Sequence, residues 1–376
     1  MTESAGHQAA GDPDQKQQEW FEVFYDLVFA VAVALWAERV GQEPTVAAYA
    51  RSAGFLLPIW WVWLGQTVFA TRFPAGSMTV QALSIMQVIA VGVMAAQFLQ
   101  EQPISASFPL GFVAARLALL AMYARAARRS PVARSVATVY LVGFGTGAAI
   151  WAVSVLMPAE SRPFAWALGL AVDFATPWVR RSTLQRLPLD PHHLSDRVSL
   201  FNSLLLYVAI EGIVRGVAEK GRGAQTIMVA LLSFSLVVSL WWIYAARVNR
   251  GDTRAVLGAA LPYVYSQFLV VLGVGTCSIG IRAMGQAEAK HATALLASGM
   301  LLWIGGLILI RGVVLRHRDR YWYVPFLLAL VVIPLVVIGG AGRPLMTLAL
   351  LDVVVLALLT IELRHGTGHA GPTHRL

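Results

Sequence analysis

Apolar stretches of about 20 residues fill most of the chain, and short polar segments separate them. A helix that crosses a lipid bilayer needs about 20 consecutive, mostly apolar residues. The pattern therefore predicts an all-α fold, a polytopic transmembrane helical bundle of about twelve spans. We expect these spans near residues 20–40, 46–70, 79–99, 107–126, 135–157, 163–180, 196–217, 225–246, 255–280, 291–313, 322–339 and 345–362.

Composition agrees with a membrane protein. Of the 376 residues, 57% are hydrophobic and 13% are charged, whereas soluble proteins average about 25% charged residues. In a soluble protein, the formal net charge of +9 would suggest nucleic acid as a partner. Here the basic residues lie between the apolar stretches, where membrane topology explains them. We therefore expect contact with membrane lipids and none with nucleic acid, and the sequence identifies no partner protein.

The distribution of basic residues predicts the orientation. The heaviest basic segments lie at 124–134, 179–186, 247–254 and 311–320. With the spans above, all four fall on the same side of the membrane as both chain ends. Because Lys and Arg are enriched in cytoplasmic loops, we predict a multi-pass protein of the cell inner (plasma) membrane with both termini in the cytoplasm.

The longest polar segment between spans predicts how the chain is divided. Residues 181–195 are expected to form a cytoplasmic linker loop between a first transmembrane half, 20–180, and a second one, 196–362. The ends, 1–19 and 363–376, are polar and are expected to be disordered cytoplasmic tails.

Some residues recur at similar places in the two halves. Asp26 and Asp196 open the first span of each half, and Asp173 and Asp352 lie in the sixth. This is the pattern of two six-helix repeats related by an axis along the membrane normal. The offsets are unequal, so chance similarity between apolar helices is the alternative.

Four charges inside or near the spans of the first half are the main candidates for chemistry. Glu22 and Asp26 lie one helical turn apart, and Arg116 and Asp173 lie near the middle of their spans. A charge in the hydrocarbon core costs roughly 2.5 to 3.5 kcal/mol on insertion scales, so intramembrane charges are functional candidates. Arg116 is too deep to reach the membrane surface easily, and we predict that it pairs with Asp173, Asp26 or Glu22. An ion pair that only fixes helix packing is the alternative.

The seventh span adds further charged candidates for ligand binding or ion pairing. Asp196 and Arg197 open it, which also fits a cytoplasmic helix start with Asp near the positive end of the helix dipole. Glu211 precedes Arg215 by four residues, a spacing that allows a local ion pair.

No metal or cofactor site is predicted. The chain has no HExxH motif and no Gly-rich phosphate loop. His192 and His193 are expected to be ordinary loop histidines. The single cysteine, Cys277, lies in an apolar stretch and is expected to be a structural thiol, since one cysteine allows no intrachain disulfide.

Several segments carry a family resemblance. The segment EVFYDLVF at 22–29 resembles the E-L-F-F-D-L-V-F signature of bacterial low-temperature-requirement A (LtrA) proteins. The resemblance continues in order through LLPIWWVWLGQTVFATRF at 56–73, GFVAARL at 111–117, WALGLAVDFATP at 166–177, HLSDRVSLF at 193–201 and WWIY at 241–244. It implies a multi-pass membrane protein and supplies no defined biochemical activity.

The chain departs from the family pattern at several polar positions. Pro74 and Ala245 stand where the family usually has Asp, and Gln267 stands where a His is expected. The resemblance therefore implies a divergent member. The charges that it keeps are Glu22, Asp26, Arg116, Asp173, Asp196 and Arg197.

Two functional hypotheses follow. The first is a membrane protein that binds or transports a small molecule through an interhelical cavity with buried carboxylates. Asp26 and Asp173 would contact the substrate or a proton, and Arg116 would supply the counter-charge.

The second hypothesis is a membrane-embedded, metal-independent enzyme that acts on a lipophilic substrate such as an isoprenoid. A buried, protonated carboxyl group can act as a general acid. Asp26 or Asp173 would then be catalytic, in a cyclase or isomerase of a biosynthetic pathway.

Overall fold

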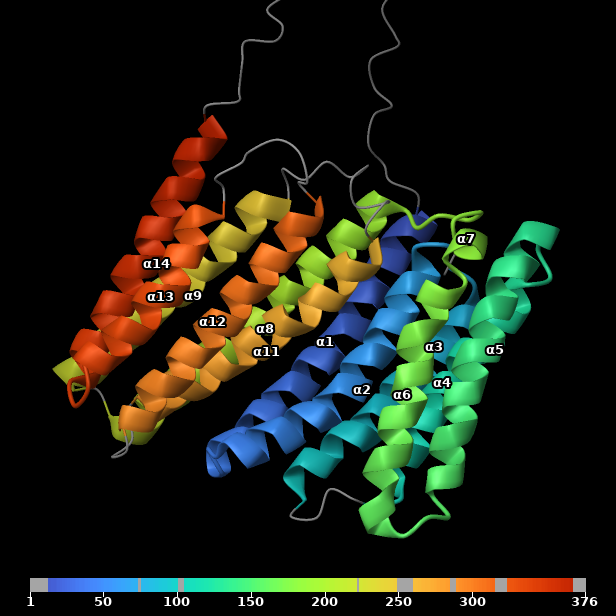
Figure 1. The fold of residues 1–376 in the computed structure, drawn as a ribbon, viewed down its shortest axis with the longest axis horizontal. Helices are drawn as coiled ribbons and strands as arrows, with labels where there is room; N and C mark the ends of the chain where they lie inside the picture. Colours follow the sequence, from blue (N-terminus) through green and yellow to red (C-terminus); the bar gives the residue numbers. More distant parts are fainter. Residues whose placement is uncertain are drawn as a thin grey trace, which may run out of the picture. The chain divides into compact units, whose positions relative to one another are not determined.

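The computed structural model describes residues 13–73, 76–100, 105–221, 223–248, 260–284, 289–314 and 323–367. These residues form helices and short connections, and they contain no β-strand (Figure 1). The all-α prediction is therefore confirmed for the described part of the chain.

Each predicted span coincides with a long helix. The bounds are α1 (Pro13–Gln42), α2 (Val46–Ala70), α3 (Met78–Ala95), α4 (Ser107–Ala126), α5 (Pro131–Ser154), α6 (Arg162–Val179), α8 (Pro191–Lys220), α9 (Ala224–Val248), α11 (Ala260–Ala283), α12 (Ala289–Val314), α13 (Val324–Gly339) and α14 (Pro344–Thr367). A short helix, α7 (Arg181–Leu184), lies within the predicted linker.

Ten of these helices are long and apolar enough to cross a membrane, in the part of the chain that is described. The two others are α6 and α13, at the sixth and eleventh predicted spans, and α13 has only 16 residues. A polytopic helical membrane protein is thus supported, and ten of its described helices have the length and composition of a span.

The structure describes only part of the predicted tails and of two of the basic segments. Helix α1 begins at Pro13 and α14 ends at Thr367, while residues 1–12 and 368–376 lie outside the described residues. Most of the basic segments 247–254 and 311–320 also lies outside them.

Contacts divide the chain into two compact units. Unit 1 comprises residues 1–29, 61–97 and 102–190, and unit 2 comprises residues 30–60, 98–101 and 191–376. Helices α1 and α2 therefore each contribute residues to both units. The predicted halves, 20–180 and 196–362, stay a prediction.

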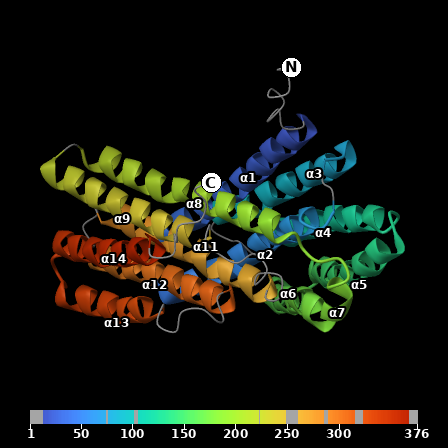
Figure 2. The ribbon, with the colours of Figure 1, turned by 90° about the horizontal axis from the view of Figure 1, so that it is seen from above.

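Within each unit the helices pack against their neighbours. In unit 1, α3 packs on α4, α4 on α5, and α5 on α6. In unit 2, α11 packs on both α8 and α12, and α14 packs on α9 and α13 (Figures 1 and 2).

Small residues explain the close approach of α11 to α12. A Cβ atom added to Gly280 would lie 2.5 Å from the backbone nitrogen of Leu296, and one added to Gly299 would lie 2.5 Å from that of Cys277. Only glycine leaves room for two helix backbones at this separation, as is common between membrane helices.

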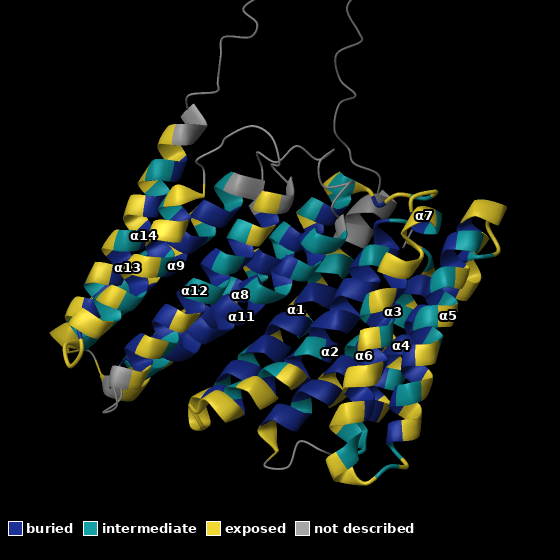
Figure 3. Cartoon of the chain, in the orientation of Figure 1, coloured by how far each residue is buried: buried dark blue, intermediate teal, exposed yellow. Residues whose placement is uncertain are grey.

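Burial differs strongly between helices. In the apolar windows of α2 and α11, 78% and 83% of residues are buried, against 33% in α14 (Figure 3). The outward faces of α13 and α14 are nevertheless apolar, with Leu335 and Val353 about 60% exposed. In a bilayer such faces contact lipid tails, which need no polar surface.

Candidate functional site

A buried ion pair lies among the helices of unit 1. The Nη2 atom of Arg116 on α4 is 2.8 Å from Oδ2 of Asp173 on α6, and both side chains are 1% exposed or less. The predicted pairing of Arg116 is therefore confirmed, with Asp173 as its partner.

Aromatic rings enclose this pair. Nε1 of Trp61 donates a hydrogen bond of 3.1 Å to Oδ2 of Asp173. The Arg116 guanidinium lies 4.9 Å from the ring centre of Phe112, 4.7 Å from that of Phe144 and 5.9 Å from that of Trp61. Because a cation is attracted to aromatic faces, the rings supply part of the solvation that Arg116 loses on burial.

Several polar atoms of Arg116 and Asp173 have no hydrogen-bond partner among the described residues. Nε and Nη1 of Arg116 and Oδ1 of Asp173 form no hydrogen bond with any described residue. A buried charge with missing hydrogen bonds is costly, so the attraction between Arg116 and Asp173 must offset that cost.

Asp26 takes part in a separate contact. Its side chain is fully buried on α1, and its Oδ1 accepts a hydrogen bond of 2.8 Å from Nε1 of Trp63 on α2. The neighbouring Tyr25 hydroxyl donates to Oε1 of Gln87 at 3.2 Å, and Gln87 Nε2 donates to the Ala115 carbonyl at 3.1 Å. The carboxylate of Asp26 is thus held by an indole, not by Arg116.

The other predicted charges lie elsewhere. Glu22 is half-buried on α1; Asp196 is exposed at the start of α8, and its neighbour Arg197 is buried. His192 and His193 precede them in the same helix, and the described residues contain no group of three potential metal ligands.

A polar cluster in unit 2 joins three helices. Nδ2 of Asn202 on α8 donates to the Tyr244 hydroxyl on α9 at 2.8 Å and to Oε1 of Gln267 on α11 at 3.3 Å. Gln267 is the residue that stands where the family pattern has a His. A cavity of about 20 Å³ beside Asn202 and Tyr244 has room for roughly one water molecule.

The larger cavity lies in unit 2, between α1, α8, α11 and α12. It has a volume of about 450 Å³, and Val31, Leu35 and Ile279 are among its apolar lining residues. Ligand sites typically have volumes of about 300 to 1,000 Å³. We refer to this cavity as the α1–α8 pocket.

Charged residues line the same pocket. Arg215 forms an ion pair with Glu211 one turn earlier on α8. Arg282 of α11 pairs with Glu219 at 3.4 Å. Glu38 of α1 also lines the pocket, and no described residue forms a hydrogen bond or ion pair with its carboxylate.

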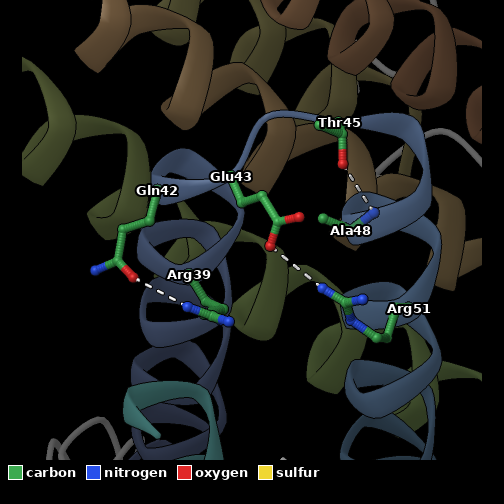
Figure 4. Close-up of polar contacts among 6 residues, drawn as sticks. All are labelled: Arg39, Gln42, Glu43, Thr45, Ala48 and Arg51. Atoms are coloured by element: carbon green, nitrogen blue, oxygen red, sulfur yellow. Dashed lines mark hydrogen bonds and ion pairs between the residues drawn. The ribbon is translucent and has the colours of Figure 1, made fainter. Parts of the chain in front are cut away.

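The turn from α1 to α2 forms part of the pocket wall through Gln42 and Pro44. Figure 4 shows the contacts that hold this turn: Arg39 donates to Gln42 at 3.4 Å, and Arg51 pairs with Glu43 at 3.3 Å. Thr45 Oγ1 accepts from the Ala48 amide at 3.2 Å and so caps α2. The cap fixes where α2 begins.

The pocket includes only one of the predicted site residues. Glu211 lines it, whereas Asp26, Arg116 and Asp173 line neither of the two cavities described above. Sequence analysis missed Glu38, although it is a charge near the end of the first predicted span. Its position in the predicted span was the available signal.

Comparisons with known proteins agree with the motif series. The family described as bacterial low temperature requirement A protein (LtrA) matches residues 17–360. An uncharacterized protein of Rhizobium meliloti (strain 1021) is 26% identical over 275 residues, which cover 69% of this chain and 66% of that relative. The match thus spans just under two thirds of the relative's length.

No solved structure matches the chain. The family match alone covers most of the sequence, from the start of the first predicted span almost to the end of the last. The chain therefore belongs to the bacterial low-temperature-requirement A (LtrA) family.

Proposed function

We propose that this protein binds a small amphipathic molecule in the α1–α8 pocket and carries it across the cell inner (plasma) membrane. The pocket itself is the observation that supports this function: about 450 Å³ between helices of membrane-spanning length, with a lining that is nearly as polar as it is apolar. Sites of this kind lie between helices of a bundle and use few polar groups for orientation.

The proposed orientation places the pocket on the outer side of the membrane. Its lining comes from the last turns of α1, α8 and α11 and the first turns of α12. With both termini in the cytoplasm, as the basic segments predict, and with α6 also crossing the membrane, α1, α8 and α11 run outward. A ligand would then enter from the outer side.

The buried charges of unit 1 have a different role in this proposal. None of them lines the α1–α8 pocket, so in this proposal they act on helix packing or carry a proton rather than touch the ligand. Proton coupling through Asp26 or Asp173 predicts that collapsing the pH gradient across vesicles slows transport. Unchanged transport rates after that collapse would exclude it.

A substitution that fills the pocket tests the proposed function. Ala34 lines the pocket, and Ala34→Trp would fill it. A panel of cationic, anionic and neutral amphipathic compounds is screened by the melting temperature of the full-length protein in detergent. Compounds that stabilise the unchanged protein but not Ala34→Trp are pocket ligands. The control is Val353→Trp, on an exposed face of α14.

Flux in vesicles then separates transport from binding and from catalysis. Pocket ligands should equilibrate across proteoliposomes that contain the unchanged protein and fail to do so with Ala34→Trp. Conversion of a ligand into a product in detergent would instead support the enzyme on a lipophilic substrate. If Ala34→Trp alters the response to no compound in the panel, the pocket is not a binding site.

A further inference from the structure

We infer that the ligand of the α1–α8 pocket carries a positively charged amine or quaternary ammonium group, and that Glu38 binds it. This inference rests on the proposed function and names the class of ligand. It follows from the pairing of charges around the pocket.

Every other acidic group described at the pocket has a partner. Glu211 is paired with Arg215, and Glu219, which lies just outside the lining, is paired with Arg282. The carboxylate of Glu38 alone has no hydrogen bond or ion pair among the described residues. Among the described residues, Glu38 is therefore the one lining carboxylate without a direct partner.

The position of Glu38 makes this charge available to a ligand. The residue is half-buried on α1, one turn beyond Ala34 and Leu35. Partial burial weakens the screening of a charge by water. A ligand cation in the pocket would thus interact with Glu38 more strongly than a cation on the open surface.

The remaining lining fits the rest of such a ligand. Tyr207 lines the pocket, and aromatic faces attract ammonium groups. Val31, Leu35, Ile279 and Leu295 supply apolar surface for a hydrocarbon body. Carboxylate, aromatic ring and apolar wall together suit an amphipathic amine.

The other cations described near the pocket do not favour an anion instead. Arg215 and Arg282 are paired with glutamates, and His291 also has a partner. Arg39 is outside the lining and donates to Gln42. An anionic ligand would therefore have to displace an existing partner, whereas a cationic one need not.

Two probes of the same shape test the charge. Benzyltrimethylammonium is compared with neopentylbenzene, in which a neutral carbon replaces the nitrogen. Binding to the full-length protein in a neutral detergent is measured by equilibrium dialysis, and retention by Ala34→Trp is subtracted. The cation should bind the unchanged protein about tenfold more tightly than the neutral analogue.

Neutralising the carboxylate should remove this preference. In Glu38→Gln, affinity for benzyltrimethylammonium should fall about tenfold or more, while affinity for neopentylbenzene should stay within about twofold. The matched control is Glu43→Gln on the adjacent turn, which lies outside the lining and pairs with Arg51. It should leave both affinities unchanged, and the melting temperature of Glu38→Gln should equal that of the unchanged protein because no contact is lost.

The outcomes separate the two proposals. If Glu38→Gln retains the cation, or if the neutral analogue binds equally well, the charge assignment is wrong. It is also wrong if the panel yields pocket ligands and none of them is cationic, in which case the pocket function stands. If Ala34→Trp blocks no compound at all, both proposals fail.

Discussion

At the scale of single residues, the cost of burying charge governs unit 1. Arg116 and Asp173 are removed from water, and their mutual attraction must offset two desolvation penalties. Trp61 and the rings of Phe112 and Phe144 supply further stabilisation. Losing one member of the pair is therefore expected to reduce the stability of the protein more than losing both.

The first prediction tests this asymmetry. Arg116→Met and Asp173→Leu should each destabilise the protein by about 3 to 5 kcal/mol, because each leaves an uncompensated buried charge. The double variant should recover part of that loss. Thermal unfolding in detergent measures it, with Arg51→Met at an exposed ion pair as the control, expected to cost about 1 kcal/mol or less. A double variant less stable than both single variants would contradict this account.

A second residue-scale prediction concerns Asp26. Trp63→Phe removes the indole that donates to its carboxylate at 2.8 Å. We expect a loss of about 1 to 3 kcal/mol, since a buried acceptor loses a donor. Trp242→Phe, at a half-exposed site on α9, should cost much less. Equal melting temperatures for the two variants would show that the hydrogen bond is unimportant for stability.

At the scale of helices, glycine positions decide how closely neighbours pack. On α5, a Cβ atom at Gly147 would lie 2.2 Å from Oδ1 of Asp173 and 3.0 Å from the Gly169 carbonyl. At Gly145, two residues earlier, nothing lies within 4 Å. The two positions therefore form a matched pair for testing the α5–α6 contact.

Gly147→Ala should destabilise the protein by about 1 to 3 kcal/mol, because overpacking moves either the helix or the Asp173 carboxylate. Gly145→Ala should be neutral or slightly stabilising, since alanine favours helix. Adding Arg116→Met to each variant should give a non-additive loss only with Gly147→Ala, as expected for residues that share a contact. If the losses of stability simply add when Arg116→Met is combined with either glycine variant, Gly147 is not coupled to the ion pair.

At the scale of the whole molecule, the number of spans determines topology. Ten helices meet the length and composition expected of a span, and α6 does not. With both termini in the cytoplasm, as we propose, the segment between α7 and α8 also lies in the cytoplasm if α6 crosses. If it does not cross, that segment lies outside.

Reporter fusions distinguish these topologies. We predict that α6 crosses, because the predicted linker is basic and basic segments favour the cytoplasm. Green fluorescent protein fused after Leu187 or after Leu376 should be fluorescent, and alkaline phosphatase fused after Gly221 should be active. Suppose instead that green fluorescent protein fused after Leu187 is dark, and that alkaline phosphatase fused at the same position is active. This result would show that α6 stays on the outer side.

The sequence by itself determined the helices and their membrane character, because a run of about 20 apolar residues has few alternatives to a spanning helix. It also predicted that Arg116 needs a carboxylate, since a lone charge in an apolar span is too costly. It left three candidate partners open.

Only the tertiary structure decided which of these groups meet. Helix packing brings Asp173 to Arg116 and leaves Asp26 with Trp63, although all three carboxylate candidates satisfied the sequence argument. It also forms the α1–α8 pocket from residues far apart in the chain, such as Glu38, Glu211 and Arg282. The residues that surround a charge in the sequence set the cost of burying it. Which partner that charge meets depends on how helices from distant parts of the chain pack together.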